Sequence, residues 1–137
     1  EPKIDLELDK DVDLTSAEVG DALSLAWDDN SVDAALLFGP LYHLTDRNDR
    51  LTALSEAYRV LKPGGVLMAV GISRFASTLD GLRAQYLKDP EFVKIMRGDL
   101  KNGLHHNPTK KLHYFMETFF HHPDEQLGQA PVVLPEW

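Results

Sequence analysis

The sequence predicts an α/β fold, and two observations lead to this prediction. Residues 32–39 (VDAALLFG) and residues 66–72 (VLMAVGI) are continuous apolar runs, as expected of parallel strands that are covered on both faces. Between them lies a segment with helical periodicity, which ends at the helix-breaking sequence KPGG. A strand, a helix and a second strand in this order predict a right-handed βαβ unit over residues 32–72.

The helix of this unit is predicted from its start signal and its apolar stripe. Thr45 or Asp46 can cap the helix by accepting hydrogen bonds from its first N–H groups. Apolar residues then follow at steps of three, four and three, which predicts one core-facing stripe made of Leu51, Leu54, Tyr58 and Leu61.

The segments before this unit are also interpreted as strands. Residues 1–14 alternate apolar and acidic side chains, which predicts one or two half-buried strands. Residues 15–25 are expected to form a short strand that ends at Gly20–Asp21, and WDDNS then supplies a turn.

Helices are expected after the unit. Residues 77–89 and 90–103 predict two helices, separated by the start signal Asp89–Pro90 and ended by Asn102–Gly103. Residues 104–122 mix polar and aromatic side chains without a clear period, residues 122–126 resemble a helix start, and residues 130–137 form a short apolar tail.

Composition and charge limit the classes of function. The chain has 137 residues, enough for one core, and its net charge of −8 opposes binding to nucleic acid. It has no cysteine, which excludes disulfides and thiolate metal sites. No apolar run approaches the roughly 18–20 residues that span a membrane, and no basic leader opens the sequence. We therefore expect a cytoplasmic protein that binds neither nucleic acid nor a membrane.

Two pairs of adjacent histidines raise a metal site as an alternative: His105–His106 and His121–His122. Adjacent side chains in strands and loops usually diverge, and no H-E-x-x-H spacing is present. We therefore expect no metal. No Ser-His-Asp arrangement or nucleophile elbow is recognisable either, which disfavours a hydrolase.

Three motifs within residues 20–82 resemble one enzyme family. They are GDA at residues 20–22, DDNSVD at residues 28–33 and YRVLKPGG at residues 58–65. With them, the segment resembles the class I S-adenosylmethionine-dependent methyltransferases of the small-molecule type. ISRFAS, HNPT and FFHHPDE are similar to the downstream region of one branch of that family, so the resemblance covers most of residues 15–127.

This resemblance implies a Rossmann-like methyltransferase fold that is truncated. The family's glycine-rich loop, G-x-G-x-G, and its first strands have no counterpart in the sequence. In the family's strand order, 3-2-1-4-5-7-6, two strands are then missing between the third and fourth, which leaves a gap of roughly 10 Å. Either the chain is a fragment of a longer protein, or the N-terminal segment pairs there, or a second copy in a homo-oligomer completes the sheet.

The expected organisation is a single α/β domain over residues 1–137. Residues 1–14 are its acidic N-terminal segment, and residues 15–76 are the methyltransferase core. Residues 77–137 form a helical and aromatic region on the substrate side, where HYFMETFFHH is interpreted equally as an aromatic lid over the substrate or as ordinary core.

The resemblance also implies a site for S-adenosylmethionine. Asp21 would accept a hydrogen bond from the adenine amino group, and the backbone of Ala22 and Leu23 would read the edge of the ring. The floor of the cleft, near the methionine part of the cofactor, would be formed by Phe38, Gly39 and Pro40. Taken without the resemblance, Asp21 would be interpreted as a turn cap.

Tyr42 and His43 would lie beside the transferable methyl group and face a small-molecule acceptor. Methyl transfer from a sulfonium is an in-line displacement in which catalysis is mostly positioning. A neutral histidine can also take a proton from the attacking atom. Packing roles for Tyr42 and His43 remain open alternatives.

The sequence therefore predicts methyl transfer from S-adenosylmethionine to a small molecule. The alternative is a non-catalytic methyltransferase-like module that acts in protein interaction or oligomerisation. The absent glycine-rich loop is the feature that separates the two interpretations.

Overall fold

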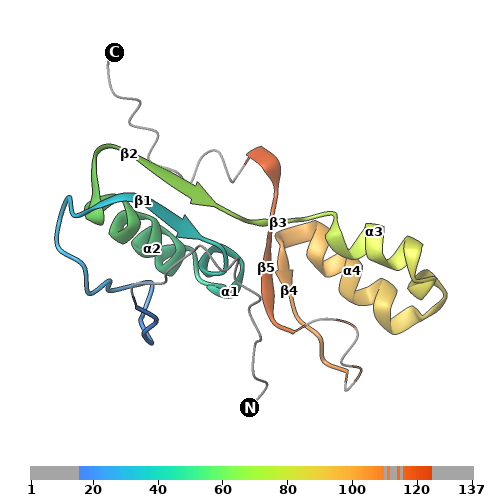
Figure 1. Ribbon diagram of the computed structural model, residues 1–137. Coiled ribbons are helices and arrows are strands. Elements are labelled where there is room, and N and C mark those ends of the chain that lie inside the picture. The colour runs from blue at the N-terminus through green and yellow to red at the C-terminus, as the bar shows by residue number, and fades with distance from the viewer. Residues whose placement is uncertain (1–15, 110, 112–113, 115, 125–137) are drawn as a thin grey trace, which may run out of the picture.

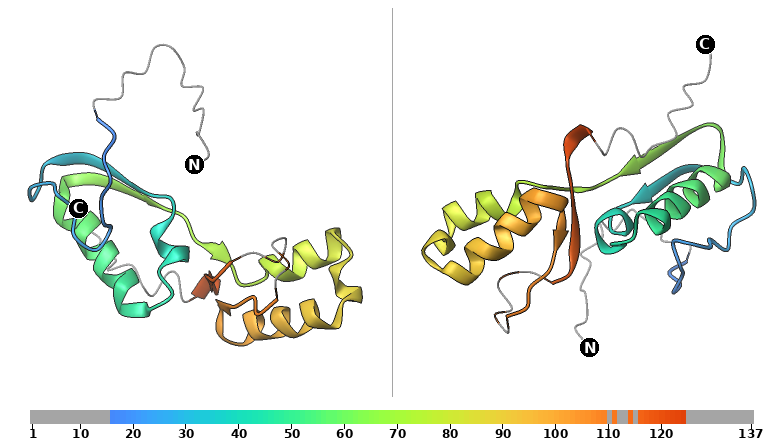
Figure 2. Two further views of the ribbon diagram at one scale, coloured as in Figure 1. Left: turned by 90° about the horizontal axis from the view of Figure 1, so that it is seen from below. Right: turned by 180° about the vertical axis from the view of Figure 1, so that it is seen from behind.

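The structure is a computed structural model, and it describes residues 16–109, 111, 114 and 116–124 (Figures 1 and 2). The strands predicted within residues 1–14 and the tail at residues 130–137 lie outside these residues. In chain order the elements are β1 (Val32–Leu37), α1 (Pro40–His43), α2 (Arg47–Val60), β2 (Leu61–Ala69), β3 (Ile72–Ser73), α3 (Ala76–Arg83), the 3₁₀ turn η1 (Tyr86–Lys88), α4 (Pro90–Asn102), β4 (Leu104–His105) and β5 (Thr118–His121).

The predicted strand–helix–strand unit is confirmed. Strands β1 and β2 pair in parallel, with Ala34 opposite Val66 and Leu37 opposite Ala69, and α2 connects them. Asp46 caps α2, because its carboxylate accepts hydrogen bonds from the backbone N–H groups of Asn48 at 2.7 Å and of Asp49 at 3.3 Å. Parallel pairing places the carboxyl ends of β1 and β2 at the same end of the sheet, beside β5 (Figure 1).

The buried face of the helix agrees only in part with the predicted stripe, since Leu54 and Leu61 are buried as expected. Its buried residues are Arg50, Ala53, Leu54, Ala57 and Val60, whereas Tyr58 is 57% exposed. Ala53 and Ala57 are both fully buried, and small side chains at this spacing let the helix backbone approach the sheet closely. The predicted stripe was therefore wrong at Tyr58, because the pattern of large apolar residues did not count the alanines.

Helix α2 covers one face of the β1–β2 pair, and the expectation of a sheet covered on both faces was wrong for the described residues. Ala35, Leu37 and Leu67 pack toward the helix with Leu41, Leu54 and Ala57. The alternate residues point to the other face, where Leu36, Val66 and Met68 are each more than half exposed. An apolar sheet face therefore remains open to solvent.

KPGG was predicted to follow the helix as a turn, but it lies inside β2. Helix α2 ends at Val60, and Lys62–Gly65 lie within β2 as an irregularity, since the register passes from Val32–Leu61 to Ala34–Val66. Gly64 has a φ of 82°, which a residue with a side chain rarely adopts. Asp33 and Lys62 form an ion pair beside this irregularity, with their side-chain atoms 2.9 Å apart.

Three other predictions need correction. No strand forms over residues 16–25, where the described backbone has only an isolated bridge between Asp21 and Ser24. The helix expected at residues 77–89 ends at Arg83, because Gln85 takes the left-handed conformation and η1 follows. Strands β4 and β5 form in the segment that showed no period, and β5 pairs in parallel with β3 and antiparallel with β4.

The second half of the chain packs α3 and α4 around an aromatic cluster. Phe92, Ile95 and Tyr114 are buried together, with Tyr86 against them. As predicted, α4 begins at Asp89–Pro90 and ends at Gly103, whose φ of 76° is a left-handed cap. Figure 2 shows the two helices side by side at one end of the molecule, with the β1–β2 pair and α2 at the other.

Strand β5 joins these two halves. The guanidinium of buried Arg50 lies 3.6 Å from the centre of the Phe119 ring, and it also donates to the carbonyl oxygens of Leu44 and Thr45 at 2.8 Å each. A further hydrogen bond joins buried His121 of β5 to the Leu41 carbonyl oxygen of α1 at 2.7 Å. The position of α1 thus depends on a segment about 80 residues further along the chain.

Two helical glycines provide a matched test of this packing. A Cβ at Gly81 in α3 would collide with the buried Phe92 ring, whereas a Cβ at Gly98 in α4 would meet no atom within 4 Å. We expect Gly81→Ala to lower the free energy of unfolding by about 1–3 kcal/mol through overpacking. Gly98→Ala should raise it by about 0.5–1 kcal/mol, because alanine is the better helix former. Urea denaturation of both variants measures the two signs, and a gain in stability for Gly81→Ala would contradict the packing described here.

Candidate functional site

The predicted floor and catalytic residues come together at the carboxyl end of β1. Phe38 follows the strand and is 54% exposed, Gly39 precedes the first turn of α1, and Pro40 occupies its first helical position. Gly39 is extended, with a φ of −169°, so its conformation does not itself require glycine. The short helix α1 then presents Tyr42 and His43, while Leu41 is buried beneath them.

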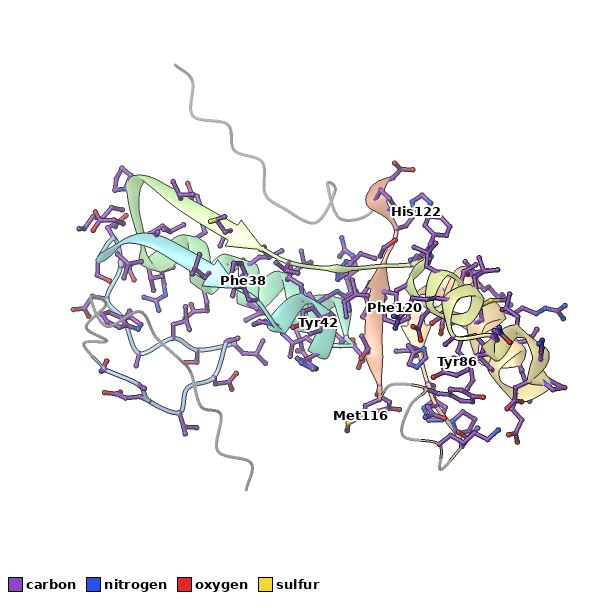
Figure 3. The ribbon with its side chains drawn as sticks, turned by 45° about the vertical axis from the view of Figure 1, so that its right-hand side comes forward. Phe38, Tyr42, Tyr86, Met116, Phe120 and His122 are labelled. Atoms are coloured by element: carbon purple, nitrogen blue, oxygen red, sulfur yellow. The ribbon has the colours of Figure 1, made fainter. Side chains whose placement is uncertain are left out.

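Tyr42 and His43 differ in what their side chains can do. The Tyr42 hydroxyl donates to the Phe38 carbonyl oxygen at 2.9 Å, which ties α1 back to the end of β1 (Figure 3). The ring centres of Tyr42 and His43 are 4.7 Å apart, with an angle of 53° between the planes. The His43 backbone N–H donates to the Gly39 carbonyl oxygen at 3.1 Å, whereas its exposed side chain makes no hydrogen bond to the part of the chain that the structure describes. Tyr42 is therefore a positioning group, and His43 presents the accessible ring nitrogens.

The predicted adenine-contacting residues lie in the turn between residues 21 and 24. One carboxylate oxygen of Asp21 accepts from the Leu23 N–H at 2.9 Å, and the Asp21 carbonyl accepts from the Ser24 N–H at 3.1 Å. Ala22 and Leu23 are half-buried. The turn borders an open cavity of about 770 Å³, which is lined also by Val19 and Trp27. Asp21 thus does cap a turn, and its second carboxylate oxygen makes no hydrogen bond to another described residue.

The two groups of predicted residues are not assembled into one site. Within the described ranges, no hydrogen bond, ion pair or ring contact joins Asp21–Leu23 to Phe38–His43. The structure therefore brings together the residues assigned to the cleft floor and to catalysis, and leaves the adenine turn apart from them.

Glu56 and Arg59 of α2 form a charged pair that holds residues 25–29, directly after the turn at Asp21. The sequence analysis did not predict this pair. Glu56 accepts from the Leu25 N–H at 2.9 Å and from Arg59 at 2.9 Å. Arg59 donates to the carbonyl oxygens of Leu25 at 3.0 Å and Trp27 at 2.9 Å, and it forms an ion pair with Asp29 at 2.7 Å. The spacing of Glu56 and Arg59, three residues apart on one helix face, was the available signal.

These contacts change the acidity of Glu56. The hydrogen bond from Arg59, followed by the one from Leu25 N–H, lowers the pKa of Glu56 from 4.5 to about 2. The same hydrogen bonds to Glu56 and Asp29 raise the pKa of Arg59. The pair is therefore charged at any ordinary pH, and it positions residues 25–29 by charge-assisted hydrogen bonds.

A second polar cluster is buried between α3, α4 and β4. One oxygen of Asp99, Oδ2, accepts from the Ser77 hydroxyl at 2.5 Å and from His105 Nδ1 at 2.9 Å. His105 Nε2 lies 2.7 Å from the Tyr114 carbonyl oxygen, so both ring nitrogens face acceptors and the ring is assigned as an imidazolium. Burial lowers the pKa of His105, but the hydrogen bond and charge of Asp99 outweigh it and raise the pKa above 6.5. Ser77 donates to the carboxylate and not to the histidine, which is not the geometry of an activated nucleophile.

The adjacent histidines diverge. His105 is buried on Asp99, whereas His106 is exposed and lies 2.8 Å from Glu117. His121 is buried on Leu41, whereas His122 contacts the edge of the Phe75 ring. Among the described residues, no group of three or more His, Asp or Glu side chains could hold a metal ion.

No helix within the described residues is long and apolar enough to cross a membrane.

The parallel β1–α2–β2 unit, with small and aromatic residues after β1, has the connectivity of one βαβ unit of a Rossmann-like sheet. The comparison with known families agrees with this architecture, since residues 5–69 match the model of a methyltransferase domain. The chain belongs to the class I S-adenosylmethionine-dependent methyltransferases, and it covers only part of their Rossmann-like fold.

Several curated proteins are similar to this chain. The demethylmenaquinone methyltransferase of Staphylococcus epidermidis is 32% identical over 108 residues, which is 78% of this chain and 41% of that protein. The ubiquinone/menaquinone biosynthesis C-methyltransferase UbiE of a Ruegeria species is 40% identical over 67 residues, 49% of this chain and 25% of that protein. The demethylmenaquinone methyltransferase of Oceanobacillus iheyensis is 34% identical over 94 residues, 66% of this chain and 37% of that protein. The chain thus spans between a quarter and two fifths of the length of these relatives, and no solved structure matches it.

The Glu56–Arg59 pair predicts a specific acid dependence. The pKa of Glu56 is lower in the folded chain than in the unfolded chain, where it is about 4.5. The ionised Glu56 therefore stabilises the fold in full above pH 4.5, and this stabilisation is lost as the pH falls through about 2. We expect Glu56→Gln to be less stable than the wild-type chain at pH 6, and the difference to vanish as the pH approaches 2. Urea denaturation across this range measures it.

Asp33→Asn is the matched control, because the Asp33–Lys62 pair is exposed and exposed pairs contribute little. A Glu56→Gln variant whose deficit stays constant between pH 6 and pH 2 would show that the carboxylate charge does not hold this loop.

Proposed function

We propose that this chain is the part of a methyltransferase that carries one wall of the S-adenosylmethionine site and the acceptor-facing residues, and that the methyl acceptor is a small molecule of the quinone type. The supporting observation is the grouping of Phe38, Tyr42 and His43 at the carboxyl end of β1, where ligands bind in open α/β sheets. The relatives named for demethylmenaquinone and ubiquinone/menaquinone biosynthesis support the class of acceptor.

The residues of the adenine turn fit the cofactor's ring. One carboxylate oxygen of Asp21 accepts a hydrogen bond within its own turn. The other makes no hydrogen bond to a described residue, so an adenine amino group can donate to it. The Leu23 N–H is already engaged by Asp21, which leaves the backbone of Ala22 as the better candidate to read the ring edge. The adjoining cavity of about 770 Å³ is large enough for a nucleoside.

S-adenosylmethionine, when bound, supplies the electrophilic methyl group. Tyr42 holds the end of β1 to α1 through Phe38, and its ring contact orients His43. His43 Nδ1 or Nε2, accessible at the surface, accepts the proton that the acceptor loses as its carbon or oxygen attacks. The exposed Phe38 ring supplies an apolar surface against which a flat acceptor can lie.

The non-catalytic alternative has one observation in its favour. The uncovered face of the β1–β2 pair presents Leu36, Val66 and Met68 to solvent, as a protein-interaction surface would. Cofactor binding separates the two functions, because an interaction module does not need it.

Isothermal titration of this chain with S-adenosylhomocysteine tests the proposal. We expect binding in the micromolar range, weakened about 10- to 100-fold in Asp21→Ala, which is the usual effect of losing a hydrogen bond to a charged group. Asp28→Ala is the control, because Asp28 is an exposed acid in the same segment.

The outcomes separate the two interpretations. No binding at millimolar S-adenosylhomocysteine would favour the interaction module. Equal binding by Asp21→Ala and the wild-type chain would exclude the adenine role of Asp21 while leaving the rest of the proposal in place.

A further inference from the structure

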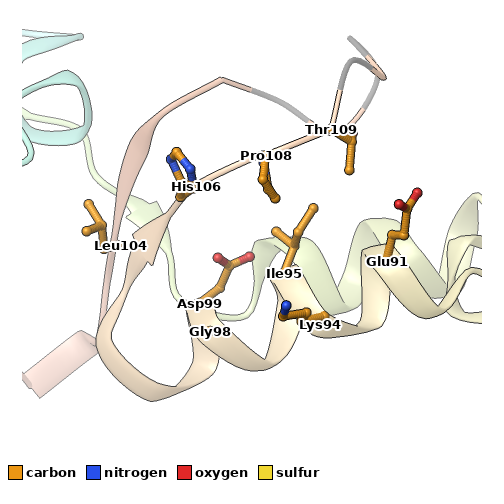
Figure 4. Close-up of a pocket in the computed structure, with 9 residues that line it drawn as sticks. All are labelled: Glu91, Lys94, Ile95, Gly98, Asp99, Leu104, His106, Pro108 and Thr109. Carbon is orange, nitrogen blue, oxygen red and sulfur yellow. The ribbon is translucent and has the colours of Figure 1, made fainter.

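A cavity of about 410 Å³ lies between α4 and residues 104–109 (Figure 4). Ile95 of α4, Leu104 of β4 and Pro108 give it apolar walls, and Lys94 and Thr109 contribute polar groups. This volume is within the range of small-molecule sites in proteins. Its lining shares no residue with the segment Phe38–His43 or with the turn at Asp21.

Asp99 lines this cavity and has an unsatisfied oxygen. The side chain is 1% exposed, and its Oδ2 accepts from both Ser77 and His105. Its Oδ1 is buried and has no hydrogen-bond partner in the described part of the chain. Figure 4 shows the carboxylate directed from α4 toward the segment that carries His106 and Pro108. A buried acceptor without a donor is costly, so a donor group delivered from the cavity would gain a full hydrogen bond.

The charges around the cavity indicate that this donor is neutral. The Asp99 carboxylate is balanced by the His105 imidazolium at 2.9 Å. Glu91 at the rim pairs with Lys111 at 3.0 Å, and His106 lies 2.8 Å from Glu117. A cation would therefore lose its hydration and find the acidic groups already paired. An anion could pair with Lys94, which makes no ion pair to another described residue, but at Asp99 Oδ1 it would be repelled by the carboxylate and would bring no donor.

We propose that this cavity is a second ligand site, specific for a neutral and mainly apolar ring compound that presents one N–H or O–H group to Asp99 Oδ1. The apolar walls bind the ring, and the unsatisfied carboxylate oxygen selects the donor. The site is separate from the proposed methyl-transfer site, because α1 packs on β5 and α4 packs on β4, with the β4–β5 pair between them. It does not depend on methyl transfer.

Indole and benzofuran test the proposal, because they have nearly the same shape and only indole carries an N–H donor. Each is titrated into the whole chain while the methyl resonances of Ile95 and Leu104 are followed by NMR. We expect saturable shifts with indole and binding at least about tenfold weaker with benzofuran, since the buried acceptor is left unpaired. No saturable shift with indole at millimolar concentration, or equal binding of the two compounds, would overturn the proposal.

Gly98→Leu is the blocking variant. A Cβ at Gly98 meets nothing within 4 Å, and Gly98 lines the cavity, so a leucine side chain there fills open space and also replaces a helix-breaking residue. We expect the melting temperature to stay at or above the wild-type value while indole binding falls at least tenfold. Retained indole binding in this variant would place the ligand elsewhere and contradict the site.

Two further variants complete the design. Gly98→Ala adds one methyl group and should leave most of the indole binding. Asp21→Ala should bind indole with the affinity of the wild-type chain, because Asp21 does not line this cavity. The indole result is therefore independent of whether the methyltransferase proposal holds. Loss of indole binding in Asp21→Ala would show that the compound occupies the cavity beside the adenine turn, and would overturn the assignment to α4.

Discussion

The parallel pairing of β1 with β2 is the constraint on which the candidate active site depends. Parallel strands cannot be joined by a tight turn, so α2 must cross between them and cover one sheet face. The same pairing brings the carboxyl ends of both strands to one edge, and α1 begins there. The pairing of Ala34–Leu37 with Val66–Ala69 therefore fixes where α1 begins, and the hydrogen bond from Tyr42 to Phe38 holds α1 against that edge.

The second half of the chain stabilises this edge from outside. α1 is only four residues long, too short to be stable as an isolated helix, and one long-range contact to it is the hydrogen bond from His121 to Leu41. Arg50 stacks on Phe119 and donates to the two carbonyl groups that follow α1. Both His121 and Phe119 belong to β5. The half of the chain that contains α3 and α4 therefore also fixes the position of Tyr42 and His43. The buried charge of Arg50 lies against carbonyl dipoles and an aromatic ring, which offset its loss of hydration.

The sequence predicted the elements whose signals are local. The cap at Asp46, the limits of α4 at Asp89 and Gly103, and the two apolar strands are all encoded within a few residues. Tyr58 was misassigned because alanine carries little weight in an apolar pattern, although its small size is what lets α2 approach the sheet. β4 and β5 were missed because two- and four-residue strands have no usable period, and they form only where partners distant in sequence meet them. The roles of His121 and Asp99 depend on separations of 80 and 22 residues, which no local pattern contains.

The open sheet face and the separation of Asp21 from His43 both agree with a chain that covers only part of the Rossmann-like fold. In the family's strand order, two strands lie between the strand that precedes the adenine turn and the strand that precedes the cleft floor. Among the described residues no strand stands between these two positions, and the Glu56–Arg59 pair of α2 holds residues 25–29 instead. The face with Leu36, Val66 and Met68 is apolar because side chains alternate along β1 and β2, and the described residues supply no layer to cover it. The chain spans between a quarter and two fifths of the length of these relatives. Under the proposed function, His43 forms one side of the site, and the sequence contains no G-x-G-x-G loop to form the other.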